Sequence, residues 1–195
     1  MEPGRSQASS PSANKTKQPP GPTPPRVLWL SCVGTSDCAV LNSIWAALDQ
    51  GHYALSALGL LWTPRARDER IQKAMDTVRH VLRVLLAEMG LEPVSVYPLE
   101  FDEEKPSSFI RAAQQAFTLA RDHDLKVVVD ITAGRKYMSA YLLGLALRRP
   151  DQVLNVVYTH LLDQRYMNAL YPLVPAPAHE LALDVSDLLV GGEPE

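Results

Sequence analysis

The stretch LKVVVDITAGRKYMSAYLLGLAL, residues 125–147, contains the pattern that decides the fold. Its first seven residues, 125–131, are mostly apolar and β-branched, which is typical of a strand buried on both faces. The glycine-bearing loop 132–136 follows, and the uncharged, apolar segment 137–147 then predicts a helix. A buried strand, a tight loop and a helix in succession indicate one unit of a parallel α/β sheet.

The same unit recurs upstream. Residues 27–33 predict a buried strand, the loop 34–37 supplies a turn and an N-cap at Ser36, and 38–48 have helical spacing. The further expected elements are strands at 54–62, 93–99 and 153–162 and helices at 67–89 and 107–123. We therefore predict an α/β fold, a Rossmann-like parallel sheet of order 3-2-1-4-5 with helices on both faces.

The two ends of the chain lead to separate expectations. We predict a C-terminal β-hairpin in which 166–174 pair back with the strand at 153–162, leaving 180–190 as either strand or helix. Residues 1–25 hold seven of the sixteen prolines and no aromatic, Val, Ile or Leu residue. Such a composition cannot form a core. The expected organisation is a disordered Pro/Ser-rich leader, 1–25, followed by a single Rossmann domain, 26–195.

Composition excludes several classes of protein. With 19 basic and 22 acidic residues, the net charge of -3 argues against binding to duplex nucleic acid. The two cysteines are too few for a disulfide framework, and the five scattered histidines lead us to assign no metal site. No apolar run is long enough for a membrane span, and no signal peptide is evident. We expect a cytoplasmic protein without a membrane partner or a resident cofactor.

The predicted topology indicates where a ligand would bind. In a sheet of this order the first and fourth strands are neighbours, and the chain leaves them in opposite directions, which opens a crevice at their carboxyl ends. Backbone N–H groups at the two helix N-termini favour an anion there, and Arg135 and Lys136 add positive charge that favours a phosphate. The candidate ligand-binding residues are Gly34, Thr35, Ser36, Asp37, Thr132, Ala133, Gly134, Arg135 and Lys136.

Two common nucleotide-binding motifs do not fit these loops. A dinucleotide fingerprint needs three glycines after the first strand and an acidic residue after the second, whereas this chain has Gly34 alone and ends its second strand at Trp62. A P-loop needs a second glycine upstream of Gly134 and a hydroxyl residue after Lys136. NAD, FAD and nucleoside triphosphate hydrolysis are therefore disfavoured.

The loop after the fourth strand, together with residues 33–37, resembles the CRISPR-associated Rossmann-fold (CARF) domain family. The family signature Asp-x-Thr-x-Gly-x-Lys is matched by Asp130, Thr132, Gly134 and Lys136, and the resemblance covers residue 26 to about 174. Ala133 departs from the pattern where a second glycine is common, and Arg135 where a small hydroxyl residue is frequent. The resemblance implies a homodimer that binds a cyclic oligoadenylate second messenger of type III CRISPR antiviral signalling across its two-fold axis.

Three functions follow as hypotheses. No arginine is followed by histidine at the spacing of a HEPN ribonuclease, so the first is a stand-alone ring nuclease. It would cleave cyclic oligoadenylate, in particular the tetra-adenylate, without a metal, with Lys136, Ser36 and Arg135 as catalytic residues. The alternatives are a non-catalytic sensor of the same messenger and a small α/β enzyme acting on a phosphorylated metabolite. We expect Asp130 to fix the following loop rather than to catalyse, and Asn42 to face solvent.

Overall fold

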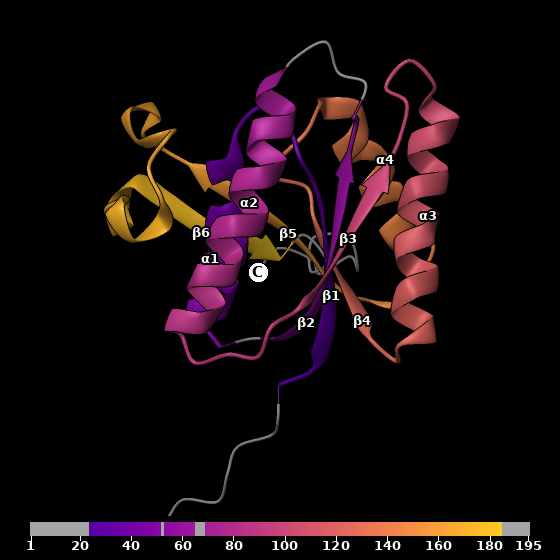
Figure 1. The fold of residues 1–195 in the computed structure, drawn as a ribbon, viewed down its shortest axis with the longest axis horizontal. Helices are drawn as coiled ribbons and strands as arrows, with labels where there is room; N and C mark the ends of the chain where they lie inside the picture. The colour runs from indigo at the N-terminus through magenta and orange to yellow at the C-terminus, as the bar shows by residue number, and fades with distance from the viewer. Residues whose placement is uncertain (1–23, 52, 65–68, 185–195) are drawn as a thin grey trace, which may run out of the picture.

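The computed structural model describes residues 24–51, 53–64 and 69–184, which form a six-stranded sheet covered by helices on both faces (Figure 1). The sheet order is β3-β2-β1-β4-β5-β6; the first five strands are parallel, and β6 is antiparallel to β5. The strands are β1 (Arg26–Cys32), β2 (Ala54–Trp62), β3 (Ser95–Glu100), β4 (Lys126–Asp130), β5 (Val153–Leu161) and β6 (His179–Asp184). The longer helices are α1 (Asp37–Asp49), α2 (Glu69–Glu88), α3 (Pro106–Asp122) and α4 (Lys136–Leu147). The predicted Rossmann-like fold and its strand order are confirmed.

The central strand β1 is buried on both faces, which explains its uninterrupted apolar sequence. Leu28, Leu30 and Cys32 pack into the core beneath α3 and α4, whereas Val27 and Trp29 pack beneath α1 and α2. Figure 1 shows these two pairs of helices on opposite sides of the sheet. A strand between two such layers has no solvent-facing side, so it does not alternate between apolar and polar residues.

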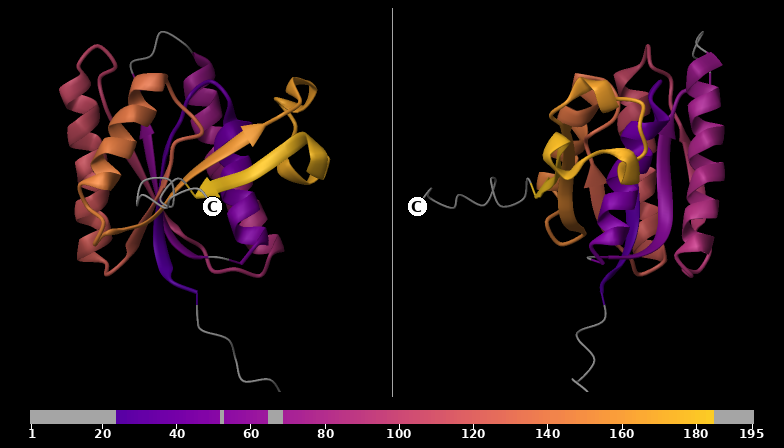
Figure 2. Two further views of the ribbon diagram at one scale, coloured as in Figure 1. Left: turned by 180° about the vertical axis from the view of Figure 1, so that it is seen from behind. Right: turned by 90° about the vertical axis from the view of Figure 1, so that its left-hand side faces the viewer.

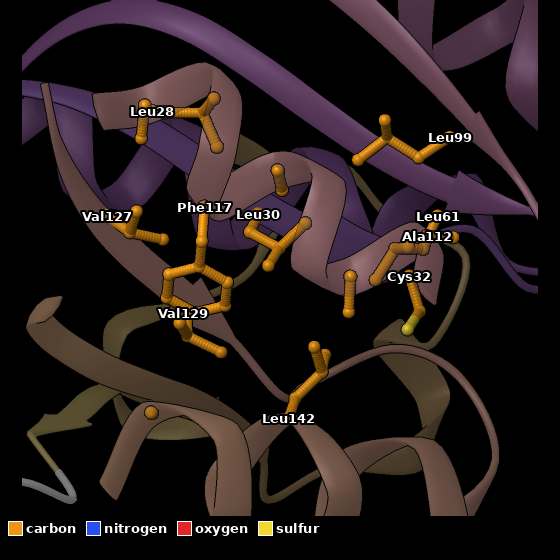
Figure 3. Close-up of a cluster of buried hydrophobic side chains, with 14 of the residues drawn as sticks. Leu28, Leu30, Cys32, Leu61, Leu99, Ala112, Phe117, Val127, Val129 and Leu142 are labelled. Carbon is orange, nitrogen blue, oxygen red and sulfur yellow. The ribbon is translucent and has the colours of Figure 1, made fainter. Parts of the chain in front are cut away.

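The core beneath α3 and α4 supports the carboxyl ends of the central strands. Figure 3 shows Phe117 of α3 and Leu142 of α4 in one cluster with Leu30 and Val129 of β1 and β4. Leu30, Val129 and Leu142 are completely buried in this cluster. Close packing of this kind leaves the strand ends little freedom to move.

The C-terminal hairpin has a different second strand from the one predicted. Residues 166–174 do not pair with β5; they contain short 3₁₀ helices, and β5 pairs instead with β6. The side chain of Asn42 on α1 holds this connection, since its Nδ2 donates to the Ala169 carbonyl at 3.0 Å and its Oδ1 accepts from the Tyr171 N–H at 2.8 Å. These are backbone groups that a ladder would need, and Pro172 has no N–H to offer. The expectation that Asn42 faces solvent is therefore wrong as well.

The connection between β5 and β6 contains three 3₁₀ helices: η1 (Gln164–Tyr166), η2 (Tyr171–Leu173) and η3 (Ala176–Ala178). Figure 2 shows it, in orange and yellow, to one side of the sheet. The segment expected at 180–190 is a strand as far as residue 184, and its remainder lies outside the described residues, as does the leader as far as residue 23.

Within the described part of the chain, no helix combines the length and apolar character needed to span a membrane.

Backbone pairing continues beyond the ends of the strands and brings three loops to one edge of the sheet. The Val33 N–H donates to the Leu61 carbonyl at 2.8 Å, and the Ile131 N–H donates to the Val157 carbonyl at 3.0 Å. The Phe101 N–H donates likewise to Trp62, at 3.0 Å. The loops after β1, β3 and β4 therefore leave the same carboxyl edge.

Candidate functional site

A cleft of about 1210 Å³ opens at this carboxyl edge. The loop after β1 and the start of α1 contribute one side of it, and the loop after β4 contributes a second. The lining residues are Val33, Gly34, Thr35, Ser36, Ala39, Thr63, Arg70, Ile71, Phe101, Asp102, Glu103, Glu104, Thr132, Ala133, Gly134, Arg135 and Met138. Seven of the nine predicted ligand-binding residues are among them. The structure therefore brings the two predicted loops together at one cavity.

Asp37 and Lys136, the other two predicted ligand-binding residues, do not line the cleft. Each is the first residue of a helix, α1 and α4 respectively. The Asp37 carboxylate accepts a hydrogen bond from the Cys38 N–H at 2.8 Å, so it acts locally at its own helix end. The Lys136 side chain is exposed to solvent. Both residues lie next to cleft-lining neighbours, Ser36 and Arg135.

The N-termini of α1 and α4 begin in the two cleft loops. Ser36 is the N-cap of α1, as predicted, and its Oγ accepts a hydrogen bond from the Ala39 N–H at 3.3 Å. Arg135 occupies the N-cap position of α4; its own side chain has no acceptor and makes no cap hydrogen bond, and its N–H donates to Met138 Sδ at 3.5 Å. The first N–H groups of a helix lack intrahelical partners and carry partial positive charge. Two such ends at one cavity create a favourable environment for an anion.

Gly134 allows the two loops to approach closely. Its φ is +99°, and a Cβ built there would lie 2.9 Å from the Cβ of Cys32 and 3.3 Å from the Sδ of Met138. A Cβ on Gly34 would lie 3.8 Å from the Gly134 nitrogen, which shows how near the two backbones run. No residue with a side chain fits at position 134 without strain.

The buried carboxylate of Asp130 holds the ends of β1 and β4 together. Asp130 has no solvent exposure; its Oδ2 accepts from the Ser31 hydroxyl at 3.0 Å and its Oδ1 from the Thr132 N–H at 2.8 Å. Burial raises the pKa of this carboxyl, while the hydrogen bonds from Thr132 and Ser31 act in the opposite direction. Asp130 does not line the cleft. It fixes the loop that follows it, as the sequence analysis expected.

The hydroxyl of Thr132 links the second loop to its surroundings. Its Oγ1 accepts from the Thr159 N–H of β5 at 2.8 Å and lies 3.1 Å from the Ser43 Oγ of α1. Ser43 is also 3.0 Å from the Thr159 hydroxyl. The Thr132 side chain is thus held by two internal groups, the Thr159 N–H and the Ser43 hydroxyl, which gives it a positioning role at the cleft wall.

A further part of the cleft lining is acidic, which was not expected from the sequence. Asp102, Glu103 and Glu104 follow Phe101 in the loop after β3, and the Nε of Arg135 forms an ion pair with Oε1 of Glu103. β3 is two strands away from β1, so its loop was not expected at the crevice between β1 and β4. The available signal was the run Phe-Asp-Glu-Glu, 101–104, at the end of a predicted strand. Arg70, at the start of α2, was also missed.

A metal site would need several His, Cys, Asp or Glu side chains close together. Over residues 24–51, 53–64 and 69–184, no group of three or more His, Cys, Asp or Glu side chains is placed to hold a metal ion. The three consecutive acidic residues of the cleft wall do not form such a group either. Asp102 is instead paired with Lys105 at 3.1 Å.

Comparison with known proteins supports the fold. No protein-family model matches the sequence, and no curated protein matches it. Among solved structures, Csm6 from Enterococcus italicus bound to cyclic hexa-2'-fluoro-hexa-dAMP aligns with 85 % of this chain at a TM-score of 0.58 and 13 % identity. The alignment covers 44 % of the Csm6 chain, so this protein spans less than half of that length. The likeness shows a shared Rossmann-like fold.

A second solved structure is an alcohol dehydrogenase from the archaeon Thermococcus sibiricus complexed with 5-hydroxy-NADP. It has 17 % identity and aligns with 56 % of this chain and 37 % of its own. Its TM-score is 0.32, which is too low to indicate the same fold.

Two glycines near α4 provide a matched test of the loop geometry. We expect Gly134→Ala to lower the free energy of unfolding by about 1–3 kcal/mol, because the loop would be strained. Gly144→Ala, inside α4 where an added Cβ meets open space, should raise it by about 0.5–1 kcal/mol. Urea unfolding measures both changes. A Gly134→Ala variant as stable as the parent would contradict the close approach of the loops.

The raised pKa of Asp130 predicts a pH dependence of stability. The folded protein keeps the proton of this carboxyl to a higher pH than the unfolded chain, whose aspartates titrate near about pH 3.9. Its stabilising contribution is therefore full below that pH and is lost as the pH rises toward the folded pKa. We expect Asp130→Asn to become more stable relative to the parent as the pH increases from about 4 to 7.

Asp163→Asn is a control for which the stability relative to the parent should change with pH in the opposite direction. Hydrogen bonds from Arg165 lower the pKa of the Asp163 carboxyl, so its contribution is present above the unfolded pKa and is lost as the pH falls. Denaturant titrations from about pH 2.5 to 7 compare the two variants with the parent, because the Asp163 contribution changes below about pH 4 and the Asp130 contribution changes above it. A difference between Asp130→Asn and the parent that does not change with pH would show that the carboxyl titrates alike in both states.

Proposed function

We propose that this protein binds a cyclic oligoadenylate in the cleft between the loops after β1 and β4 and cleaves it without a metal. Cyclic tetra-adenylate is the ligand that we choose for the tests. The observation that carries the proposal is that two glycine-containing loops and the N-termini of α1 and α4 meet at one cleft. The fold similarity to Csm6, whose structure contains a cyclic oligonucleotide, and the CARF-like signature around Gly134 support the choice of ligand.

The charges at the loop after β4 fit phosphodiesters. Arg135 lines the cleft, and its side chain is 69 % exposed, so a phosphate reaches it by replacing the Glu103 carboxylate. Lys136 begins α4, where its charge adds to the positive end of the helix dipole. A bound anion relieves that repulsion. Charge-assisted hydrogen bonds to such an anion are stronger than hydrogen bonds between neutral groups.

A ring ligand with two-fold symmetry needs two copies of the cleft. One copy would contact only part of the ring, so we propose a symmetric homodimer in which both pairs of loops face a shared ligand. In this arrangement the exposed Lys136 side chains lie at the rims of the two clefts, from which they reach phosphates that the cleft-lining residues do not contact. The homodimer thus gives Lys136 a role that one isolated cleft does not.

The proposed cleavage uses a nucleophile that the ligand itself carries. A ribose 2'-hydroxyl oxygen bonds to the adjacent phosphorus, the bond from phosphorus to the 5'-oxygen breaks, and the hydroxyl proton ends on that leaving oxygen. The product has a 2',3'-cyclic phosphate. Correct positioning alone supplies effective molarities of about 10⁵ M or more in favourable cases. Arg135, Lys136 and the loop N–H groups would stabilise the developing charge, and Ser36 would orient the ribose or phosphate.

A non-catalytic sensor is the second candidate. Two hydroxyls of the cleft are already engaged, because Ser36 caps α1 and Thr132 is held by α1 and β5. Side chains committed to fixing the loops suit a rigid binding module. The two candidates share one ligand and one cleft, and they differ in whether the ring is opened.

Lys136→Ala tests the binding site. Loss of one charge-assisted phosphate contact in each half of the dimer, at about 1.5–3 kcal/mol per contact, should weaken binding of cyclic tetra-adenylate at least tens-fold. Arg148→Ala, which removes a cation at the opposite end of α4, should bind like the parent. Calorimetric titration compares the three proteins. If Lys136→Ala binds as tightly as the parent, Lys136 does not contact the ligand.

Incubation with labelled cyclic tetra-adenylate tests the chemistry. We expect slow conversion to linear oligoadenylates with 2',3'-cyclic phosphate ends, at equal rates with and without excess EDTA. Chromatography with mass detection identifies the products. Cleavage that stops on chelation would contradict the metal-free mechanism, and a ring that stays intact for hours at protein excess would favour the sensor.

A further inference from the structure

Glu103 lies beside Arg135, which belongs to one of the loops proposed to bind phosphate. Its side chain is 27 % exposed and lines the cleft, and its carboxylate forms an ion pair with Arg135. A negative charge at this place repels a phosphodiester, which would make the cleft a weaker anion site than its loops alone provide. A carboxylate in contact with a bound nucleotide is favourable only where the ligand offers it a hydrogen-bond donor.

The position of Glu103 is fixed by the segment around it. The Asp102 N–H donates to Ser108 Oγ at 3.0 Å, and the Glu104 N–H donates to Asp102 Oδ1 at 3.1 Å. On the other side Phe101 is buried, with its ring centroid 5.0 Å from that of Phe109 on α3. These contacts anchor the loop to the start of α3. The backbone at Glu103 is thereby held at the cleft, while its carboxylate is free to exchange one partner for another.

Binding of a phosphate to Arg135 would change the partner of Glu103. The Arg135 side chain is exposed, and an ion pair to such a side chain contributes only about 0–1 kcal/mol, so exchange of partners has a low cost. The carboxylate that is left behind is partly buried and needs a new donor, because an unpaired charge in such a place is unfavourable. In an oligoribonucleotide each 3'-phosphate has a 2'-hydroxyl on the same ribose. One ligand therefore supplies an anion for Arg135 and a donor for Glu103.

We propose that Glu103 is a specificity-determining residue that accepts a hydrogen bond from a ribose 2'-hydroxyl, so that the cleft selects ribonucleotides over deoxyribonucleotides. The inference rests on the proposed function and identifies the sugar that the cleft recognises. Carboxylates accept hydrogen bonds from the ribose 2'-hydroxyl in dinucleotide sites of doubly wound sheets. A 2'-hydroxyl is the group by which a protein distinguishes RNA from DNA.

The test is a thermodynamic cycle between one side chain and one ligand group. Cyclic tetra-adenylate and its all-2'-deoxy counterpart are titrated into the parent, Glu103→Gln, Glu103→Ala and Glu100→Gln. Glu100, at the end of β3, is exposed and does not line the cleft, so it serves as the matched control. Ring recovery is checked by chromatography after each titration, and thermal unfolding verifies that the variants are folded.

We expect the parent and Glu100→Gln to bind the ribose ring about ten-fold or more tightly than the deoxy ring, as for loss of a charge-assisted hydrogen bond. Glu103→Gln should reduce this preference, and Glu103→Ala should abolish it. Both should bind the deoxy ring more tightly than the parent does, because the repulsive charge is gone. The effect of removing the Glu103 carboxylate on the binding free energy then depends on whether the ligand has its 2'-hydroxyls. Two groups that are distant and independent would show no such dependence.

Two results would overturn the inference while leaving the proposed function intact. One is a parent that binds both rings equally, and the other is a ribose preference that Glu103→Ala leaves unchanged. A parent that binds neither ring would overturn the proposed function, and the inference with it. The outcomes are distinguishable because the parent titrations test the ligand and the variant titrations test the carboxylate.

Discussion

The cleft depends on one buried carboxylate. Asp130 ends β4 without solvent exposure, and its two oxygens accept hydrogen bonds from the Ser31 hydroxyl of the neighbouring strand and from the Thr132 N–H of the following loop. A buried carboxyl is tolerated only when its oxygens are paired, so the geometry of these partners is strongly constrained. Thr132 extends the constraint to α1 and β5. The loop after β4 is therefore fixed on three sides before any ligand binds.

The electrostatic character of the cleft is mixed rather than uniformly positive. Two helix N-termini and Arg135 face a wall that carries Glu103 and its acidic neighbours. Such a site is poorly suited to a simple anion such as free phosphate, because the carboxylates oppose it. It suits a ligand in which negative groups and hydrogen-bond donors alternate at short distances. Phosphates and sugar hydroxyls alternate in this way along an oligoribonucleotide.

The sequence allowed the fold to be predicted wherever a pattern is local. The β-branched run 125–131 and the apolar run 27–33 are recognisable because both strands are buried on two faces, and glycine loops follow them. The prediction that 166–174 pair back with the preceding strand was wrong, because the side chain of Asn42, distant in sequence, binds the backbone of that segment. Glu103 was missed for a similar reason, since its approach to Arg135 depends on how the loop after β3 leaves the sheet. Long-range contacts of this kind leave no periodic signal.

The central claim is that the loops after β1 and β4 form one anion site. Backbone amide NMR on the isotope-labelled protein, titrated with cyclic tetra-adenylate, tests it most directly, since the proposed contacts include the N–H groups themselves. The account predicts the largest shift changes at Gly34, Thr35 and Ser36 and, in the same titration, at Gly134 and Arg135. Changes confined to one loop, or to a different surface such as the groove between α2 and residues 91–96, would contradict it.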